Sequence, residues 1–66
     1  MTFESGERYR HQNSLDVDLL VVDTVSDGPA WIQLKVFWVS QKSGFLLSAD
    51  EVKILKDDVS KWKKVT

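Results

Sequence analysis

Apolar residues dominate two long stretches of the chain, Leu15 to Val25 and Ala30 to Leu47. The break between them, residues 26–29, ends in Gly28-Pro29. This pair interrupts regular structure because glycine tolerates positive φ and proline lacks a backbone donor. Two long apolar stretches joined by so short a break predict a β-hairpin with long strands.

Folding this hairpin at its break places Val25 opposite Ala30 and Val21 opposite Leu34. Since side chains alternate between the two faces of a strand, we expect one apolar face that forms the core. Its predicted members are Leu15, Val17, Leu19, Val21, Val25, Ile32, Leu34, Val36 and Trp38. The opposite face is mixed, with an apolar middle. This pattern predicts a sheet that bends and buries both faces in different halves, as a small barrel does.

Shorter elements flank the hairpin. The segment Arg8–Gln12 alternates, with Tyr9 and His11 on one side and its two arginines on the other. This predicts a short edge strand whose arginines lie in water. After a turn, residues 45–47 predict a further short strand, with Leu47 on the core face.

Residues 48–63 admit two interpretations. Ser48 to Glu51 has the Ser-x-x-Glu form of a helix capping box. Helical spacing also relates Val52, Leu55, Val59 and Trp62. Alternatively, residues 52–54 alternate as a strand and residues 57–60 form one short helical turn that seats Trp62. We adopt the strand, which we expect over residues 52–56.

The predicted fold is all-β and mainly antiparallel, a small five-stranded SH3-like barrel with a short C-terminal helical turn. Residues 1–66 form a single domain, and the polar residues 1–7 are expected to be loosely ordered unless Phe3 covers an end of the core. The alternative is an α+β fold, a three- or four-stranded antiparallel sheet with one C-terminal helix.

Several segments carry a resemblance to a known group of proteins. These are Tyr9 to Asp18, Lys35 to Val39, Val52 to Ile54 and the late Trp62. Together they resemble small proteins of marine tailed phages, which we associate with SH3-like barrels. The resemblance implies the fold and a phage or environmental origin. We associate no activity with that group, so it implies no functional residue.

Composition excludes several kinds of site. Among 66 residues there is no cysteine and one histidine, which excludes a disulfide framework and the usual structural zinc sets. The first seven residues are acidic and lack the apolar core of a signal peptide, and no apolar run reaches membrane-spanning length. We therefore expect a soluble, cytoplasmic protein with no cofactor and no membrane partner.

Charge is nearly balanced, with a net charge of −1. Nonspecific affinity for nucleic acid comes from neutralising many phosphates, so this balance argues against it. The distribution is uneven, because residues 53–66 carry five lysines against Asp57 and Asp58. We expect this basic tail to be a solvated surface that aids solubility rather than a binding site.

Candidate catalytic and metal-binding residues are few. Asp16, Asp18 and Asp23 lack the spacing of a calcium loop, and we expect solvated carboxylates. His11 has no positioned partner that the sequence reveals, and we expect a strand residue rather than a general base. We predict no catalytic, metal or cofactor site, and hence no enzyme.

Aromatic residues give the most informative functional signal. On the mixed face of the hairpin, Trp31 and Phe37 flank Lys35. Aromatic groups around a cation can bind peptides or stack nucleic-acid bases. The candidate binding surface is therefore Trp31, Lys35, Phe37 and Val39. The alternative is that curvature buries Phe37, while Trp31 covers an end of the core or a subunit contact.

The function predicted from these residues is a noncatalytic protein-interaction module with an unidentified protein partner. Exposed apolar surface on the mixed face also predicts a homodimer built around Trp31 and Phe37. The alternative function is a single-stranded nucleic-acid-binding small barrel that uses these aromatic residues and the lysines of the tail.

Overall fold

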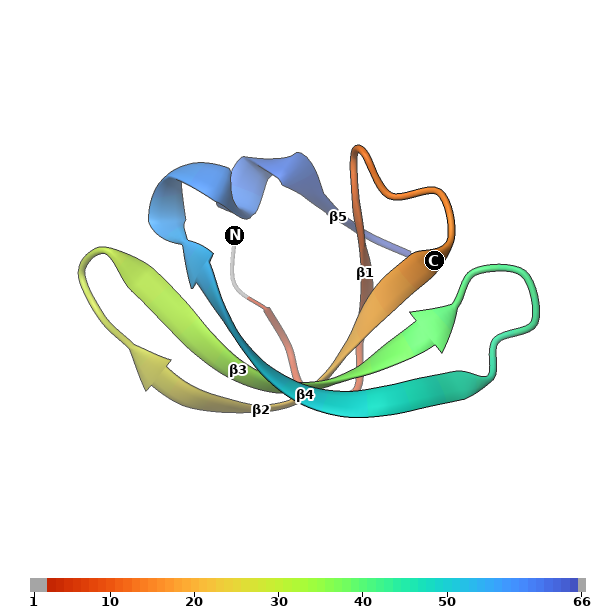
Figure 1. Cartoon of the computed structure of the whole chain (residues 1–66). Helices are drawn as coiled ribbons and strands as arrows, with labels where there is room; N and C mark the ends of the chain where they lie inside the picture. Colours follow the sequence, from red (N-terminus) through yellow and green to blue (C-terminus); the bar gives the residue numbers. More distant parts are fainter. Residues whose placement is uncertain (1–2, 66) are drawn as a thin grey trace.

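Antiparallel strands in one sheet make up most of the structure, a computed structural model that describes residues 3–65 (Figure 1). The strands are β1 (Arg8–His11), β2 (Val17–Asp27), β3 (Trp31–Ser40), β4 (Leu46–Leu55) and β5 (Trp62–Lys64). A short 3₁₀ helix, η1 (Lys56–Lys61), connects β4 to β5. In the described residues the strand order is β4-β3-β2-β1-β5. The predicted all-β fold with five strands and a short C-terminal helical turn is confirmed.

The sheet is strongly curved but open. β4 and β5 stand at the two ends of the strand order and do not pair within the described residues. Figure 1 shows η1 above the concave side of the sheet, where it carries the chain from one margin toward the other. The expectation of a closed barrel is therefore corrected. β5 has three residues and pairs with β1, so among residues 3–65 no strand pairs with the outer side of the long β4.

The last third of the chain resolves the ambiguity between strand and helix. β4 runs unbroken from Leu46 to Leu55, so the alternative of one continuous helix over residues 48–63 is wrong. The predicted short strands at 45–47 and 52–56 are instead parts of this one strand. The fifth strand is β5, which the sequence did not reveal. Because β5 pairs with β1 along Tyr9–His11, β1 is an interior strand rather than the predicted edge strand.

The core lies on the concave face. Its buried members are Phe3, Tyr9, Leu19, Val21, Ile32, Leu34, Val36, Ile54 and Val59, and Trp38, Val52 and Trp62 pack against them. Most of the predicted core face is therefore confirmed. Leu15, Val25 and Leu47 are corrections, because they are 86%, 46% and 56% exposed. Leu15 precedes β2, while Val25 and Leu47 sit where the strand register shifts.

The hairpin register differs from the expected one by two residues. Val21 faces Val36 rather than Leu34, and further along Thr24 faces Leu34. At the end of the hairpin Asp27 faces Ile32, four residues out of the expected register, and two register shifts, between Val21 and Asp23 and between Thr24 and Ser26, reduce this offset to two. Before the first shift, an offset of two preserves the alternation of faces, so the predicted face survives although the predicted pairs do not.

The N-terminal segment closes one end of the core. Phe3 is buried, and its ring lies 4.8 Å from Tyr9 and 6.4 Å from Trp62, both edge to face. The backbone N–H of Gly6 donates to the carbonyl of Val21 at 2.8 Å. Phe3 thus packs against both β1 and β5. Residues 1 and 2 of the segment expected to be loosely ordered lie outside the described residues.

Candidate functional site

The predicted binding surface alternates along β3, so its residues share the convex face, opposite the core. Trp31 is 42% exposed and Lys35 is exposed, whereas Phe37 is half-buried. Val39 is 2% exposed, lies opposite Asp18 and offers no surface to a ligand. The structure therefore leaves Trp31, Lys35 and Phe37 accessible at intervals along the strand.

Neighbouring strands supply partners to these residues. The ammonium of Lys53 on β4 lies 5.2 Å from the ring centroid of Trp31, a cation–π contact that covers one ring face. Lys35 stands between Asp23 on β2 and Glu51 on β4 in the ladder of paired residues. Opposite charges therefore alternate across the convex face, which lowers the positive potential around Lys35.

A shallow hollow opens on the convex face beside Phe37. It has a volume of about 340 Å³ and is lined by Val22, Lys35, Val36, Phe37, Ala49, Asp50 and Glu51. Ala49 lies directly opposite Phe37 on β4. Because the alanine side chain is small and β4 is the marginal strand, the hollow reaches the margin of the sheet.

Asp18 is the buried charge of the structure's convex face. Its side chain has no exposed surface, although the sequence predicted a solvated carboxylate. Arg10 binds it through two contacts, Nε to Oδ1 at 2.7 Å and Nη2 to Oδ2 at 3.0 Å, and Arg8 Nε lies 3.1 Å from Oδ2. The hydrogen bond to Asp18 is the main cause that raises the pKa of Arg10. The arginines predicted to lie in water therefore neutralise this carboxylate.

Most lysines of the basic tail have acidic partners. Lys56 pairs with Asp27, Lys61 with Asp58 at 3.1 Å, and Lys64 with Glu7 at 3.6 Å. Surface ion pairs of this kind contribute little to stability, but they reduce the local positive potential. The tail is therefore a weak candidate for a phosphate-binding surface.

The sheet has three margins without a neighbouring strand in the described residues, and two of them carry features that discourage pairing. β5 is three residues long and contains Lys63 and Lys64. The second half of β2, residues 22–27, contains both register shifts of that strand. Short length, lysines and bulges are devices by which natural sheets block association through an edge.

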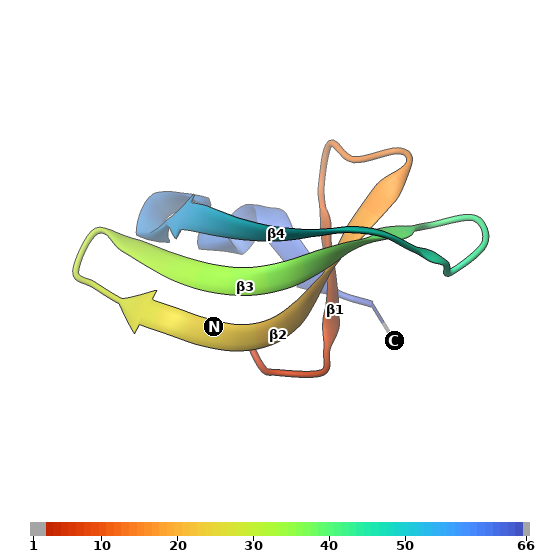
Figure 2. The same ribbon diagram turned by 60° about the horizontal axis from the view of Figure 1, so that its bottom comes forward.

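The outer margin of β4 is long and, over residues 48–55, free of register shifts, although it carries Asp50, Glu51 and Lys53. We call it the β4 edge and define it as the outer side of residues 48–55, which pair with β3 in unbroken register. The register shift of this pair falls earlier, at Leu47. Figure 2, which shows the sheet from its convex side, places β4 at the margin with η1 behind it. Residues 48–51 are exposed. The β4 edge therefore presents backbone groups for pairing with another strand.

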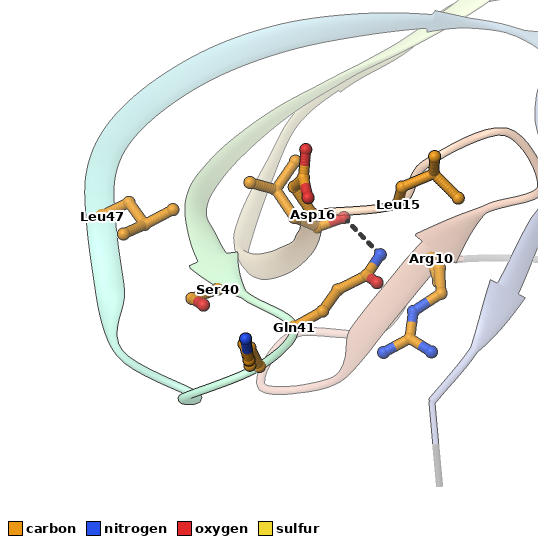
Figure 3. Close-up of a pocket in the computed structure, with 8 residues that line it drawn as sticks. Arg10, Leu15, Asp16, Ser40, Gln41 and Leu47 are labelled. Atoms are coloured by element: carbon orange, nitrogen blue, oxygen red, sulfur yellow. Dashed lines mark hydrogen bonds between the residues drawn. The ribbon is translucent and has the colours of Figure 1, made fainter.

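A second hollow lies at the end of the sheet formed by the turn after β3. Its volume is about 540 Å³, and Leu15 and Leu47 lie on opposite sides of it in Figure 3. Gln41 lies between them and donates through Nε2 to the carbonyl of Val17 at 3.0 Å. Neighbouring Phe45 and Leu46 are also exposed. Exposed apolar residues thus lie around this hollow, while its lining also includes the polar side chains of Arg10, Asp16, Ser40, Gln41 and Lys42.

The ring of His11 makes contacts within the fold. Its Nδ1 accepts a hydrogen bond from the backbone N–H of Asn13 at 3.1 Å, and its ring lies edge to face with Trp62 at 5.0 Å. Within residues 3–65 no three His, Cys, Asp or Glu side chains are grouped so that they could hold a metal ion. The structure thus supplies His11 with contacts that orient it in the fold.

Two further findings bear on function. Across the described residues, no helix combines the length and the apolar character needed to cross a membrane. No protein-family model, curated protein or solved structure matches the chain. Function must therefore be inferred from the geometry of this molecule alone.

Sequence reasoning found the convex-face residues but missed the β4 edge. The alternation of Val52 to Ile54 indicated a strand there, yet whether a strand is marginal depends on which strands pair with it. That order is set by β5, whose three residues carry no distinct pattern. Asp18 was also missed, although Arg8 and Arg10 on one face of β1 are a signal for a carboxylate partner.

Proposed function

We propose that this protein is a noncatalytic protein-interaction module, an SH3-like arrangement of strands that binds a protein partner by strand addition at the β4 edge. The single observation that carries the proposal is the unbroken register of residues 48–55 at the margin of the sheet. An added strand satisfies the free backbone groups of such a margin, and side-chain pockets beside it provide selectivity.

The convex face supplies such a pocket. The hollow that contains Phe37 and Ala49 adjoins the β4 edge, so a side chain from an added strand can reach Phe37 across Ala49. Trp31 and Lys53 lie further along the same face. Backbone pairing and one apolar pocket together account for the exposed residues on this side of the molecule.

Selection of binding peptides from a random library, followed by amide shift mapping by NMR, tests this function. We expect selected peptides to perturb β4 and the Phe37 hollow. Ala49→Lys fills the hollow beside Phe37 with a long charged side chain and should abolish binding. Thr24→Lys, on the exposed half of β2, is the matched control and should leave binding unchanged. Peptides that perturb the surroundings of Leu15 and Leu47 instead would contradict the proposal.

A second candidate function is single-stranded nucleic-acid binding, favoured by the exposed Trp31 beside Lys53. The same contact counts against it, because Lys53 covers a ring face on which a base would stack. Titration of tryptophan fluorescence with oligonucleotides at two salt concentrations separates the two functions. We expect no saturable change. Binding that weakens steeply with salt would favour nucleic acid.

A further inference from the structure

We propose that the partner strand at the β4 edge is β4 of a second copy of this chain, paired antiparallel about a two-fold axis at Val52. This inference rests on the proposed function of the β4 edge and adds the identity of its occupant. The charges along β4 and the register between β3 and β4 support this pairing.

Charge allows few registers for self-pairing. A two-fold axis perpendicular to the sheet places one residue opposite its own copy and keeps each face continuous. An axis at Asp50, Glu51 or Lys53 would therefore set like charges against each other, which is unfavourable for directly opposed residues. An axis at Ser48 or Ala49 would carry the pairing across the shift at Leu47.

An axis at Val52 removes both problems. It pairs residues 49–55 of one copy with residues 55–49 of the other, all within the regular part of β4. Glu51 then lies opposite Lys53 of the second copy, and the symmetry repeats this pair. Two opposite-charge pairs therefore fix the register from both sides of the axis.

The convex face becomes continuous in this register. Within one chain Trp31 faces Leu55, and Phe37 faces Ala49. Self-pairing sets Leu55 opposite Ala49 of the second copy, so an apolar row runs from Trp31 through Leu55 and that Ala49 to Phe37 of the second copy. Leu55, which is 54% exposed in the single chain, thereby gains a place beside the Phe37 hollow.

The concave face is compatible with the same register. Leu34 is buried opposite Val52, and the two Val52 side chains meet at the axis, so the central row is apolar. Asp50 lies opposite Ile54 of the second copy. Its carboxylate keeps its own partners, Trp38 Nε1 at 3.0 Å and the backbone N–H of Glu51 at 2.8 Å.

Charge reversal followed by sedimentation equilibrium tests the pairing. We expect a reversible dimer of the wild-type chain. Glu51→Lys and Lys53→Glu should each weaken dimerisation by about tenfold or more, because each sets like charges together twice. The double variant restores opposite charges and should recover most of the affinity. Lys42→Glu, on the exposed turn after β3, is the control for net charge and should change little.

Cysteine scanning tests the register independently, since the chain contains no cysteine. Single variants at Ala49, Asp50, Glu51 and Val52 are oxidised under identical conditions. Val52→Cys should give the most disulfide-linked dimer, because the geometry of a disulfide requires close Cα atoms and the axis brings only this residue opposite itself. Circular dichroism of each variant confirms that it is folded.

The outcomes separate this inference from the proposed function. A monomer at every concentration, or cross-linking that peaks at another residue, overturns the self-pairing about Val52. If that monomer still binds selected peptides at the β4 edge, and Ala49→Lys abolishes the binding, the proposed function stands. Loss of dimerisation in both single charge variants with recovery in the double variant supports the inference.

Discussion

At the scale of the residue, Asp18 occupies a position that alternation predicts to be exposed, yet the structure buries it. It stands on the convex face yet is fully buried, because Arg8 and Arg10 reach it from β1. Those arginines keep 32% and 42% of their side-chain surface exposed. The cluster therefore has a smaller desolvation penalty than a wholly buried ion pair.

Asp18→Asn removes the charge while keeping the size. We expect it to lower the free energy of unfolding by about 2 kcal/mol, the range for charged hydrogen bonds, since partial exposure of the arginines moderates the loss. Asp16→Asn, at an exposed position just before β2, should change it by less than about 0.5 kcal/mol. Urea titration measures both, and equal small changes would show that Asp18 is solvated.

Asp50 gives a pH-dependent prediction. The hydrogen bond from Trp38, and then that from the backbone N–H of Glu51, lower the pKa of Asp50 below its ordinary value of 3.8. A lowered pKa in the folded state means that this stabilisation is present above 3.8 and is lost as the pH falls below it. Trp38→Phe should therefore raise the pKa of Asp50 toward 3.8.

NMR titration of the carboxyl carbons checks the Asp50 prediction. Urea titration at about pH 6 and about pH 3 supplies the second measurement. The free energy of unfolding should fall less between these pH values in Trp38→Phe than in the wild type. An unchanged pKa for Asp50 in that variant would rule out the Trp38 hydrogen bond as the main cause.

At the scale of the element, alternation predicted β1, β2, β3 and the face that is buried, but not β5, the continuity of β4 or the places where strands shift. Val25 and Leu47 alternate correctly in the sequence and are exposed in the structure, each at a register shift. A shift depends on how two strands fit together, which one strand's sequence does not encode. The predicted pairs of the hairpin were displaced because the strands begin to pair at Asp27 and Ile32 rather than at Val25 and Ala30.

Leu34 and Leu47 were both predicted on the core face, but only Leu34 is buried. Leu34 has no exposed surface, and Leu34→Ala should cost about 2 to 5 kcal/mol of unfolding free energy. Leu47 is exposed, and Leu47→Ala should cost less than about 1 kcal/mol. Denaturant titration of both variants measures the difference. A loss at Leu47 as large as that at Leu34 would return Leu47 to the core face that alternation predicted.

At the scale of the whole molecule, the sequence predicted an all-β fold with a late helical turn. The unpaired edge at β4 was revealed only by the structure. Three residues, Trp62–Lys64, decide that β1 is interior and β4 is marginal. The candidate residues Trp31 and Phe37 were found from the sequence because they are aromatic on a mixed face. Their relation to Leu55 and Ala49 needed the register of β3 with β4.

Amide hydrogen exchange at two protein concentrations, about a hundredfold apart, tests the central claim that the β4 edge is the surface through which this protein associates. Outward-facing amides between Ala49 and Leu55 should exchange more slowly at the higher concentration, while those of residues 22–27 on β2 should exchange at the same rate. Exchange along β4 that does not change with concentration, or protection that grows on β2 instead, would contradict the account.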